Sequence, residues 1–250
     1  AYADWKARSD LSFGLGATYE RNAFNQLAYA TPWANTIESF GLWAHADWKP
    51  TASDRLKVGV RRDDFSDFAG KTTGEVTWGH ILNKQVTTHL KAATAYRAPS
   101  ANDLAYGTSQ NLILRPKANR AFEAGLRFNS TDASGPNWTL VAFENNLTDL
   151  IDYDPNDNYK TFNIAKARTR GVELGVEARP TKGIRLFGAA TSLQTKALTN
   201  YLGVVAAGES LLRRPTFTLS AGAEITPTER WSFGAGVTLL HGRVDYDWGN

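Results

Sequence analysis

The feature that most constrains the fold is a two-residue alternation of apolar and small or polar side chains. Residues 11–19 read LSFGLGATY, so Leu11, Phe13 and Leu15 share one side of an extended chain and serine and glycine take the other. Successive side chains of a β-strand point to opposite faces, so each such segment has one apolar and one wettable face. Repeated many times, this pattern predicts an all-β fold, an antiparallel transmembrane β-barrel with lipid outside and a polar interior.

The alternation predicts about eleven strands of a sheet. The clearest case is 171–178, where Val172, Leu174 and Val176 oppose Glu173 and Glu177, so that the charges avoid the apolar row. The segment 138–145 is apolar on both faces, and its orientation stays open. The expected strands cover 11–21, 40–49, 55–63, 72–82, 87–97, 121–128, 138–145, 167–179, 184–194, 217–225 and 231–239.

The connections alternate in length, which gives the sheet a polarity. Short ones, such as 83–84 and 180–183, are rich in turn-forming residues. The long ones are expected at 22–36, 98–119, 147–165 and 196–214. Outer-membrane barrels keep short turns on the periplasmic side and long loops outside, so the parity favours that class.

Composition agrees with a barrel and excludes other classes. The 250 residues contain no run of eighteen apolar residues, which excludes a membrane-spanning helix, and the mean hydropathy of −0.38 does not register alternating strands. Eight tryptophans suit an aromatic girdle at the membrane interfaces. A net charge of +3 is too small to indicate a nucleic-acid partner.

An odd strand count would leave the last strand ending on the long-loop side, whereas bacterial single-chain barrels have even counts. An open sheet of eleven strands would also expose two unpaired edges in hydrocarbon, where unsatisfied backbone groups are prohibitive. We therefore expect residues 1–250 to be part of a single larger barrel domain. The sequence has no methionine and no signal peptide at its start, which is consistent with a processed or excised chain.

Several segments, in order along about 200 residues, resemble motifs of TonB-dependent outer-membrane receptors. YRAPSANDL at 96–104 is similar to the family's FRAPSLNDLY, and RPK at 115–117 to its NPNLKPE. The stretch FNIAKARTRGVE at 162–173 resembles NI.KARIRGVE, and LRRP at 212–215 resembles LLRRP. Within the family, the vitamin B12 (cobalamin) transporters are the most similar subgroup, followed by siderophore and colicin receptors.

The resemblance implies a 22-stranded barrel in the Gram-negative outer membrane, plugged by an N-terminal domain. It implies TonB-dependent uptake of a large scarce nutrient, a corrinoid or a siderophore chelate, with the TonB complex acting through the plug. The plug, the TonB box and the C-terminal strands are expected to lie outside this chain. Membrane lipid is the other expected partner, and neither an enzymatic activity nor a cofactor is implied.

The long loops combine aromatic and adaptable polar side chains, which suit a large, flat, partly polar ligand. The expected ligand-contacting residues are Tyr106, Asn111, Tyr153, Tyr159 and Tyr201. Packing of loop against loop is the alternative role for each of them.

Residues 152–158 (DYDPNDN) could also bind calcium, because Asp152, Asp154 and Asp157 alternate as in the start of an EF-hand loop. The glycine expected at position six and the glutamate at position twelve are replaced by Asp157 and Asn163, so a solvated loop is the favoured interpretation. No metal site is therefore predicted.

Charged residues on the small-residue faces should point into the barrel and pair with each other or with the plug; they are Arg97, Arg127, Glu173, Glu177 and Glu224. The four histidines form no metal-binding motif, and no serine nucleophile elbow is present, which argues against an enzyme. Two other classes stay open: a passive porin-like barrel, and a soluble β-rich binding module whose apolar rows pack inside a closed globule.

Overall fold

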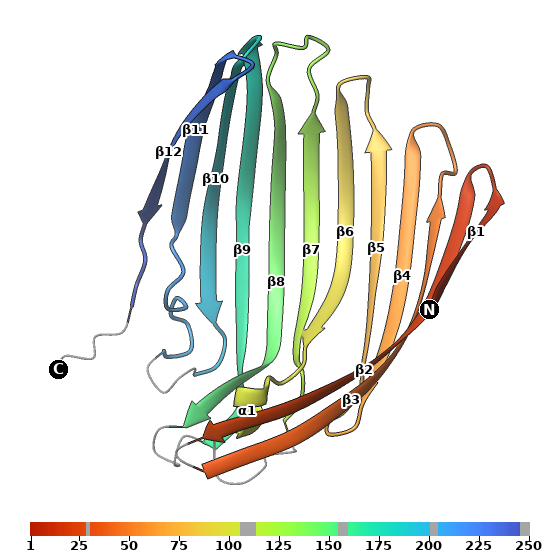
Figure 1. Cartoon of the computed structure of the whole chain (residues 1–250), viewed down its shortest axis with the longest axis vertical. Helices are drawn as coiled ribbons and strands as arrows, with labels where there is room; N and C mark the ends of the chain where they lie inside the picture. The colour runs from red at the N-terminus through yellow and green to blue at the C-terminus, as the bar shows by residue number, and fades with distance from the viewer. Residues whose placement is uncertain (29–30, 106–113, 155–159, 201–204, 246–250) are drawn as a thin grey trace.

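The computed structural model describes residues 1–28, 31–105, 114–154, 160–200 and 205–245, which form a single curved sheet of twelve strands (Figure 1). The strands are antiparallel and follow sequence order, each pairing with its neighbours along the chain. One short helix, α1 (Ala101–Ala105), lies in the β6–β7 connection. The strands are β1 (Tyr2–Arg8), β2 (Leu11–Ala28), β3 (Thr31–Trp48), β4 (Asp54–Phe65), β5 (Lys71–Ile81), β6 (Val86–Arg97), β7 (Lys117–Phe128), β8 (Asn137–Asp154), β9 (Lys160–Thr181), β10 (Ile184–Ala197), β11 (Phe217–Thr228) and β12 (Trp231–His241).

The predicted count of about eleven strands is too low by one, because the alternation does not indicate β1. Its sequence, YADWKAR, is short, and Asp4 and Lys6 interrupt any small-residue face. β1 nevertheless pairs with β2, from Tyr2 opposite Gly16 to Lys6 opposite Ser12. The antiparallel barrel-type sheet is confirmed, but the argument from an odd strand count is not. The sheet is open: β1 and β12 are its edges.

One face of the sheet, the outer face, carries the apolar rows. Cross-strand register keeps them together, with Leu15 opposite Ala44 and Leu42 opposite Ala17. These side chains are exposed rather than packed: Leu15 is 63% exposed, Leu42 52% and Val237 67%. A soluble globule would bury such rows, so the soluble-module alternative is wrong and the lipid-facing interpretation holds.

The opposite, inner face is polar but also holds aromatic rings seated on glycines. Phe143 lies opposite Gly171, where an added Cβ would come within 2.9 Å of the ring. Phe187 covers Gly222 in the same way, at 2.6 Å. This pairing orients residues 138–145, which the sequence left open: Phe143 points inward because a glycine makes room for it.

The short-turn edge carries an aromatic girdle, at the upper end of the strands in Figure 1. Five of the eight tryptophans lie on the outer face near this edge. The indole of Trp48 donates to Asp10 at 3.3 Å, and that of Trp78 donates to Asp54 at 3.0 Å. An apolar ring with a wet N–H suits a membrane interface, so the girdle is confirmed on this edge. The five are Trp5, Trp48, Trp78, Trp138 and Trp231.

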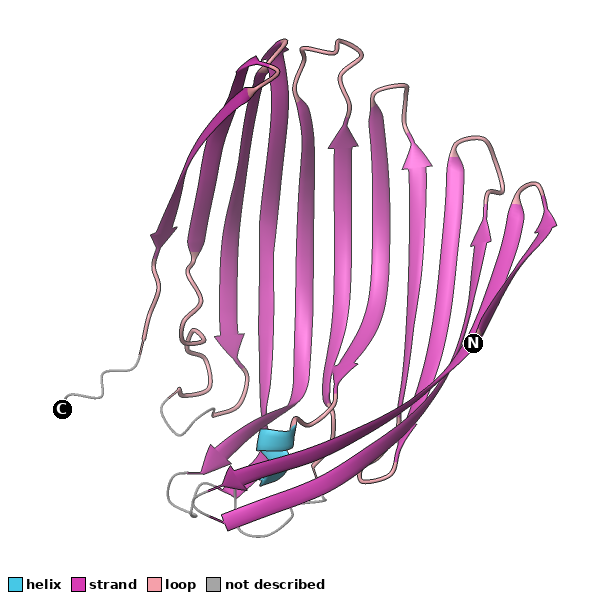
Figure 2. Ribbon diagram, viewed as in Figure 1, coloured by secondary structure: helices cyan, strands magenta, loops and turns pink. Residues whose placement is uncertain are grey.

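At the long-loop edge the strands run further than predicted (Figure 2). The expected loop at 22–36 is an extension of β2 and β3, paired from Asn22 opposite Ile37 to Ala28 opposite Thr31. The expected loop at 147–165 is likewise largely strand, since β8 continues to Asp154 and β9 begins at Lys160. Beyond the membrane neither face of a hairpin meets lipid, so no strict alternation marks the strand there.

Helices contribute little to this fold. Within the described ranges, the structure has no helix of the length and apolar character that a membrane crossing needs.

Candidate functional site: the mouth at the long-loop edge

The polar inner wall is held by ion pairs between neighbouring strands. Lys91 Nζ lies 3.1 Å from Glu75, and a hydrogen bond of 2.6 Å joins His89 Nε2 to Glu123. These side chains are half-exposed, so their polar atoms remain open to water or to a molecule inside the barrel. The wall is therefore a polar surface with paired charges, in contrast to the apolar outer face.

The lumenal charges predicted from the sequence divide into two groups. Arg185 donates to Glu177 at 2.8 Å and to Glu224 at 3.2 Å, so those two glutamates are paired across strands as expected. Among the described residues, no ion pair involves the other three. They are Arg97, Arg127 and Glu173.

Nearer the mouth, Arg61 and Asp63 form a tight pair on β4. Arg61 Nε donates to Asp63 at 2.7 Å, and its Nη2 donates to Thr18 at 2.9 Å. Asp63 is only 2% exposed, so its charge requires this partner. Gly41 on β3 makes the approach possible, because a Cβ there would meet the Arg61 guanidinium at 2.4 Å.

Apolar residues from distant strands meet under the long loops. Ile37 of β3 and Ile151 of β8 belong to one buried cluster, although four strands separate β3 from β8 in the sheet. The sheet's curvature brings them together, and the β6–β7 connection fills the space with Leu104 and Leu114. Phe68, from the β4–β5 connection, completes this mouth cluster. The described ends of the β6–β7 connection, 98–105 and 114–116, thus pack against the inner side of the mouth.

The stretch APSANDLA adopts a capped turn within that connection. Ser100 and Asp103 form a reciprocal capping box: the Ser100 N–H donates to the Asp103 carboxylate at 2.8 Å, and the Asp103 N–H donates to Ser100 Oγ at 3.1 Å. The Asp103 carbonyl accepts a hydrogen bond of 2.6 Å from Thr161 on β9. The motif therefore shapes a helical turn and fastens it to the wall.

A second fastening joins the same connection to β8 and β9. Asn163 accepts from the Arg115 N–H at 2.7 Å and donates to the carbonyls of Arg115 and Asp149, both at 2.8 Å. Arg115 Nη2 also lies 2.7 Å from the Asp149 carboxylate. Asp149 has a φ of 55°, a left-handed conformation that aspartate tolerates at modest cost. Arg115 and Asn163 lie within segments that carry the family resemblance, but nothing in the sequence alone pairs them.

The predicted ligand residues are only partly placed. Tyr106, Asn111, Tyr159 and Tyr201 lie outside the described residues. Tyr153 is on β8 with its backbone opposite Thr161, and its side chain is outside the description. Their role in ligand contact stays a prediction.

The calcium candidates are in the same position. The backbones of Asp152 and Asp154 belong to β8, with side chains outside the description, and Asp157 is not described. In the described part of the chain, no group of three acidic, histidine or cysteine side chains could hold a metal ion.

Known structures share this sheet across nearly the whole chain. The siderophore receptor PirA from Pseudomonas aeruginosa superposes with a TM-score of 0.74 at 19% identity, covering 95% of this chain and 44% of that protein. The ferric enterobactin receptor PfeA from the same organism, in complex with BCV-L6, gives 0.76 at 18% identity, covering 96% and 40%. The copper transporter OprC gives 0.72 at 17%, covering 96% and 42%. The chain thus spans less than half the length of these proteins.

The family comparison covers every residue. The model described as "TonB dependent receptor-like, beta-barrel" matches residues 1–250. An open antiparallel sheet with an apolar outer face, a polar inner wall and a tryptophan girdle is what part of such a barrel requires. The chain therefore belongs to the TonB-dependent receptor β-barrel family and resides in the outer membrane of a Gram-negative bacterium.

Proposed function

We propose that this chain forms part of the barrel wall and of the mouth of a receptor. The receptor takes up a large scarce nutrient, a ferric siderophore or cobalamin, by TonB-dependent transport. The observation that carries the proposal is the mouth. The described ends of the β6–β7 connection are fastened on the inner side by Asn163, the capping box and the mouth cluster. A passive pore needs an unobstructed polar opening, whereas a receptor needs positioned loops that hold a ligand before transport.

Of the two nutrients, the ferric siderophore is the one we propose first. The solved structures that superpose on this chain include receptors whose names specify siderophores, PirA and PfeA. The sequence motifs are the support for cobalamin. In either case no bond is made or broken, so we propose no catalytic residue and no resident cofactor.

We also propose that residues 1–250 are one part of a single barrel domain. β1 and β12 are unpaired edges within the described sheet, and an unpaired edge is unfavourable in hydrocarbon. Further strands would satisfy both edges, and a plug domain would occupy the polar interior and receive the pull of the TonB complex.

Uptake by cells that carry the full natural protein tests the function. Cells lacking their other receptors are offered radiolabelled ferric enterobactin, ferric citrate or cobalamin, with and without a working TonB complex. Accumulation of one of these, abolished without TonB, is the expected result. Equal entry of small solutes through the protein, independent of TonB, would instead indicate a passive pore.

A further inference from the structure

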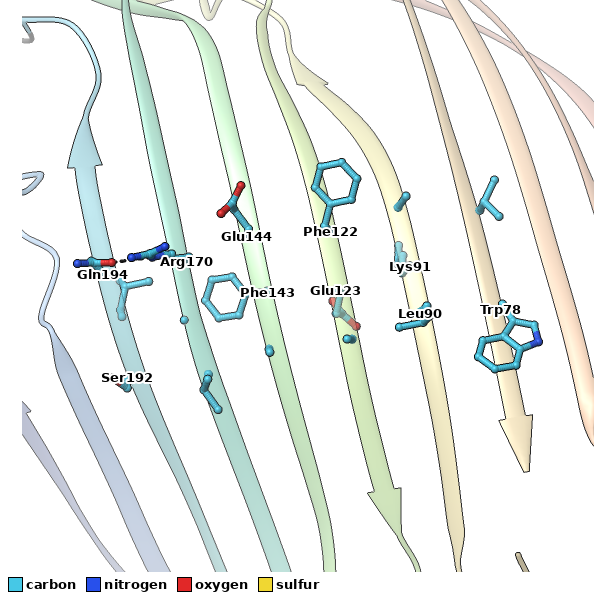
Figure 3. Close-up of a pocket in the computed structure, with 17 residues that line it drawn as sticks. Trp78, Leu90, Lys91, Phe122, Glu123, Phe143, Glu144, Arg170, Ser192 and Gln194 are labelled. Atoms are coloured by element: carbon cyan, nitrogen blue, oxygen red, sulfur yellow. Dashed lines mark hydrogen bonds between the residues drawn. The ribbon is translucent and has the colours of Figure 1, made fainter. Parts of the chain in front are cut away.

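The outer face contains a groove of about 840 Å³ that spans β5 to β10 (Figure 3). Val76 and Trp78 line the groove while Thr77 between them does not, which places it on the outer side of the sheet. Lys91 and Phe143 also border the groove. Because they alternate with outward residues, their side chains point inward, and they border it through their backbone. The groove therefore opens toward membrane lipid and not into the barrel.

Small residues form the floor of the groove, and larger ones form its sides. Ala124 pairs with Ala142 across β7 and β8, and their outer neighbours in the same row are Leu90 and Val172. Phe122, 54% exposed, stands beside this row. An apolar trough with such a profile fits the hydrocarbon chain of a lipid, because van der Waals contact follows its length.

Toward the long-loop edge the same face becomes basic. On β9 the chain reads Arg168, Arg170, Val172 at successive outward positions, with Arg168 nearest the loops. Two complete rows across β7, β8, β9 and β10 follow from the strand register. The row at the end of the groove is Phe122, Glu144, Arg170 and Gln194, and the next is Arg120, Asn146, Arg168 and Lys196.

These two rows hold four cationic side chains and one carboxylate. Glu144 accepts a hydrogen bond of 2.9 Å from Asn146, and Arg170 Nε donates to Gln194 at 2.6 Å, which positions the guanidinium at the groove (Figure 3). Arg120 and Lys196 are exposed, and within the described residues neither has an ion-pair partner. The patch therefore carries an excess of positive charge directly beyond an apolar trough.

We infer that this surface, the outer groove with its basic rows, binds a phosphorylated acylated lipid of the outer leaflet. The acyl chain lies in the trough, and the anionic head lies against Arg120, Arg168 and Lys196. Charge complementarity selects this occupant, because guanidinium groups bind phosphate oxygens in pairs. The long-loop edge of an outer-membrane barrel faces outward, which puts the basic rows at the headgroup level of the outer leaflet.

The charge requirement is tested in the full natural protein, in phosphatidylcholine nanodiscs containing either diphosphoryl lipid A or its dephosphorylated form. Native mass spectrometry measures how much of each lipid the protein retains. The triple variant Arg120→Gln, Arg168→Gln, Lys196→Gln is compared with Lys49→Gln, Lys182→Gln, Arg230→Gln, which removes the same charge at the short-turn edge. Loss of roughly tenfold or more in retention of the diphosphoryl form, only in the first variant, is expected, because each basic group at the headgroup level adds to the attraction for the anionic head.

Equal retention by the wild type and both variants would overturn the inference, as would displacement of the lipid by inorganic phosphate alone. The trough is tested separately with Ala142→Phe, which fills its floor and keeps the face apolar. Ala221→Phe, on the same face outside the groove, is the matched control. Lipid retention should fall for Ala142→Phe only. Unchanged retention in that variant would show that the groove does not hold the acyl chain of the lipid. Both tests are independent of the nutrient that the receptor transports.

Discussion

The short-turn edge and the long-loop edge, at the two ends of the strands, differ in how their residues are held. At the short-turn edge, two-residue turns such as Lys182-Gly183 join regular strands, and tryptophans hydrogen-bond to aspartates in or next to the turns. At the long-loop edge, strands project as hairpins, and the β6–β7 connection is fastened by side chains from β8 and β9. The first edge is shaped by the membrane interface, and the second by contacts among loops. The position of the sheet in the bilayer is thus set by local sequence, whereas the structure of the mouth is set by packing between residues far apart in the sequence.

That difference explains what sequence could predict. Where one face meets lipid, as at Val172, Leu174 and Val176, alternation is enforced, and the strand and its orientation were predicted correctly. Where neither face meets lipid, as at 22–28, the constraint disappears and the strand was missed. Phe143 shows a third case, since its inward orientation depends on Gly171 of the neighbouring strand, which no local pattern reveals.

The mouth could be predicted only as a set of motifs. Ser100 and Asp103 have the spacing of a capping box, but the partner of their turn, Thr161, is 58 residues further along the chain. Arg115 and Asn163 are separated by 48 residues and meet only because β7, β8 and β9 are neighbours. The tyrosines predicted to contact ligand remain predictions.

The largest effect on stability is expected from placing a charged side chain on the apolar outer face within the membrane. Leu174→Arg places a cation on the lipid side and should destabilise the folded protein by roughly 2–4 kcal/mol. Glu173→Arg puts the same side chain on the inner face and should cost much less. Urea unfolding of the full protein in lipid vesicles measures both; equal losses would show that the two faces have been assigned wrongly.

A smaller, local effect is expected from releasing the β6–β7 connection. Asn163→Ala removes three hydrogen bonds to the backbone at Arg115 and Asp149, and should lower the opening free energy of residues 114–117 by about 1–3 kcal/mol. Hydrogen exchange of those amides reports the change, together with reduced binding of the transported nutrient. Asn83→Ala, which removes an equivalent side-chain cap in the β5–β6 turn, is the control at the other edge. If it affects nutrient binding as strongly, the mouth has no special role.

The capping box should contribute slightly less. Ser100→Ala leaves the Asp103 N–H without its partner and is expected to cost about 1 kcal/mol in the stability of the α1 turn. Faster exchange of the amides at 101–105, with unchanged global unfolding, is the predicted result. Global destabilisation of the same size would mean that the turn is part of the main folding unit.

The smallest effect is expected at the girdle. Trp78→Phe keeps an aromatic ring at the interface and removes the hydrogen bond to Asp54, so a loss of about 0.5–1.5 kcal/mol in unfolding free energy is expected. Trp231→Phe should change less, because its indole donates to no side chain among the described residues. A larger loss for Trp231→Phe would contradict the role given to the turn aspartates.

The central claim is that the outer face meets lipid while the inner face does not. The chain has no cysteine, so single cysteines introduced at each position from 172 to 177 can carry a nitroxide label in the membrane-embedded full protein. Oxygen, which concentrates in hydrocarbon, should relax the labels at 172, 174 and 176 far more than those at 173, 175 and 177. Oxygen accessibility without a period of two, or low accessibility at all three apolar positions, would contradict the account.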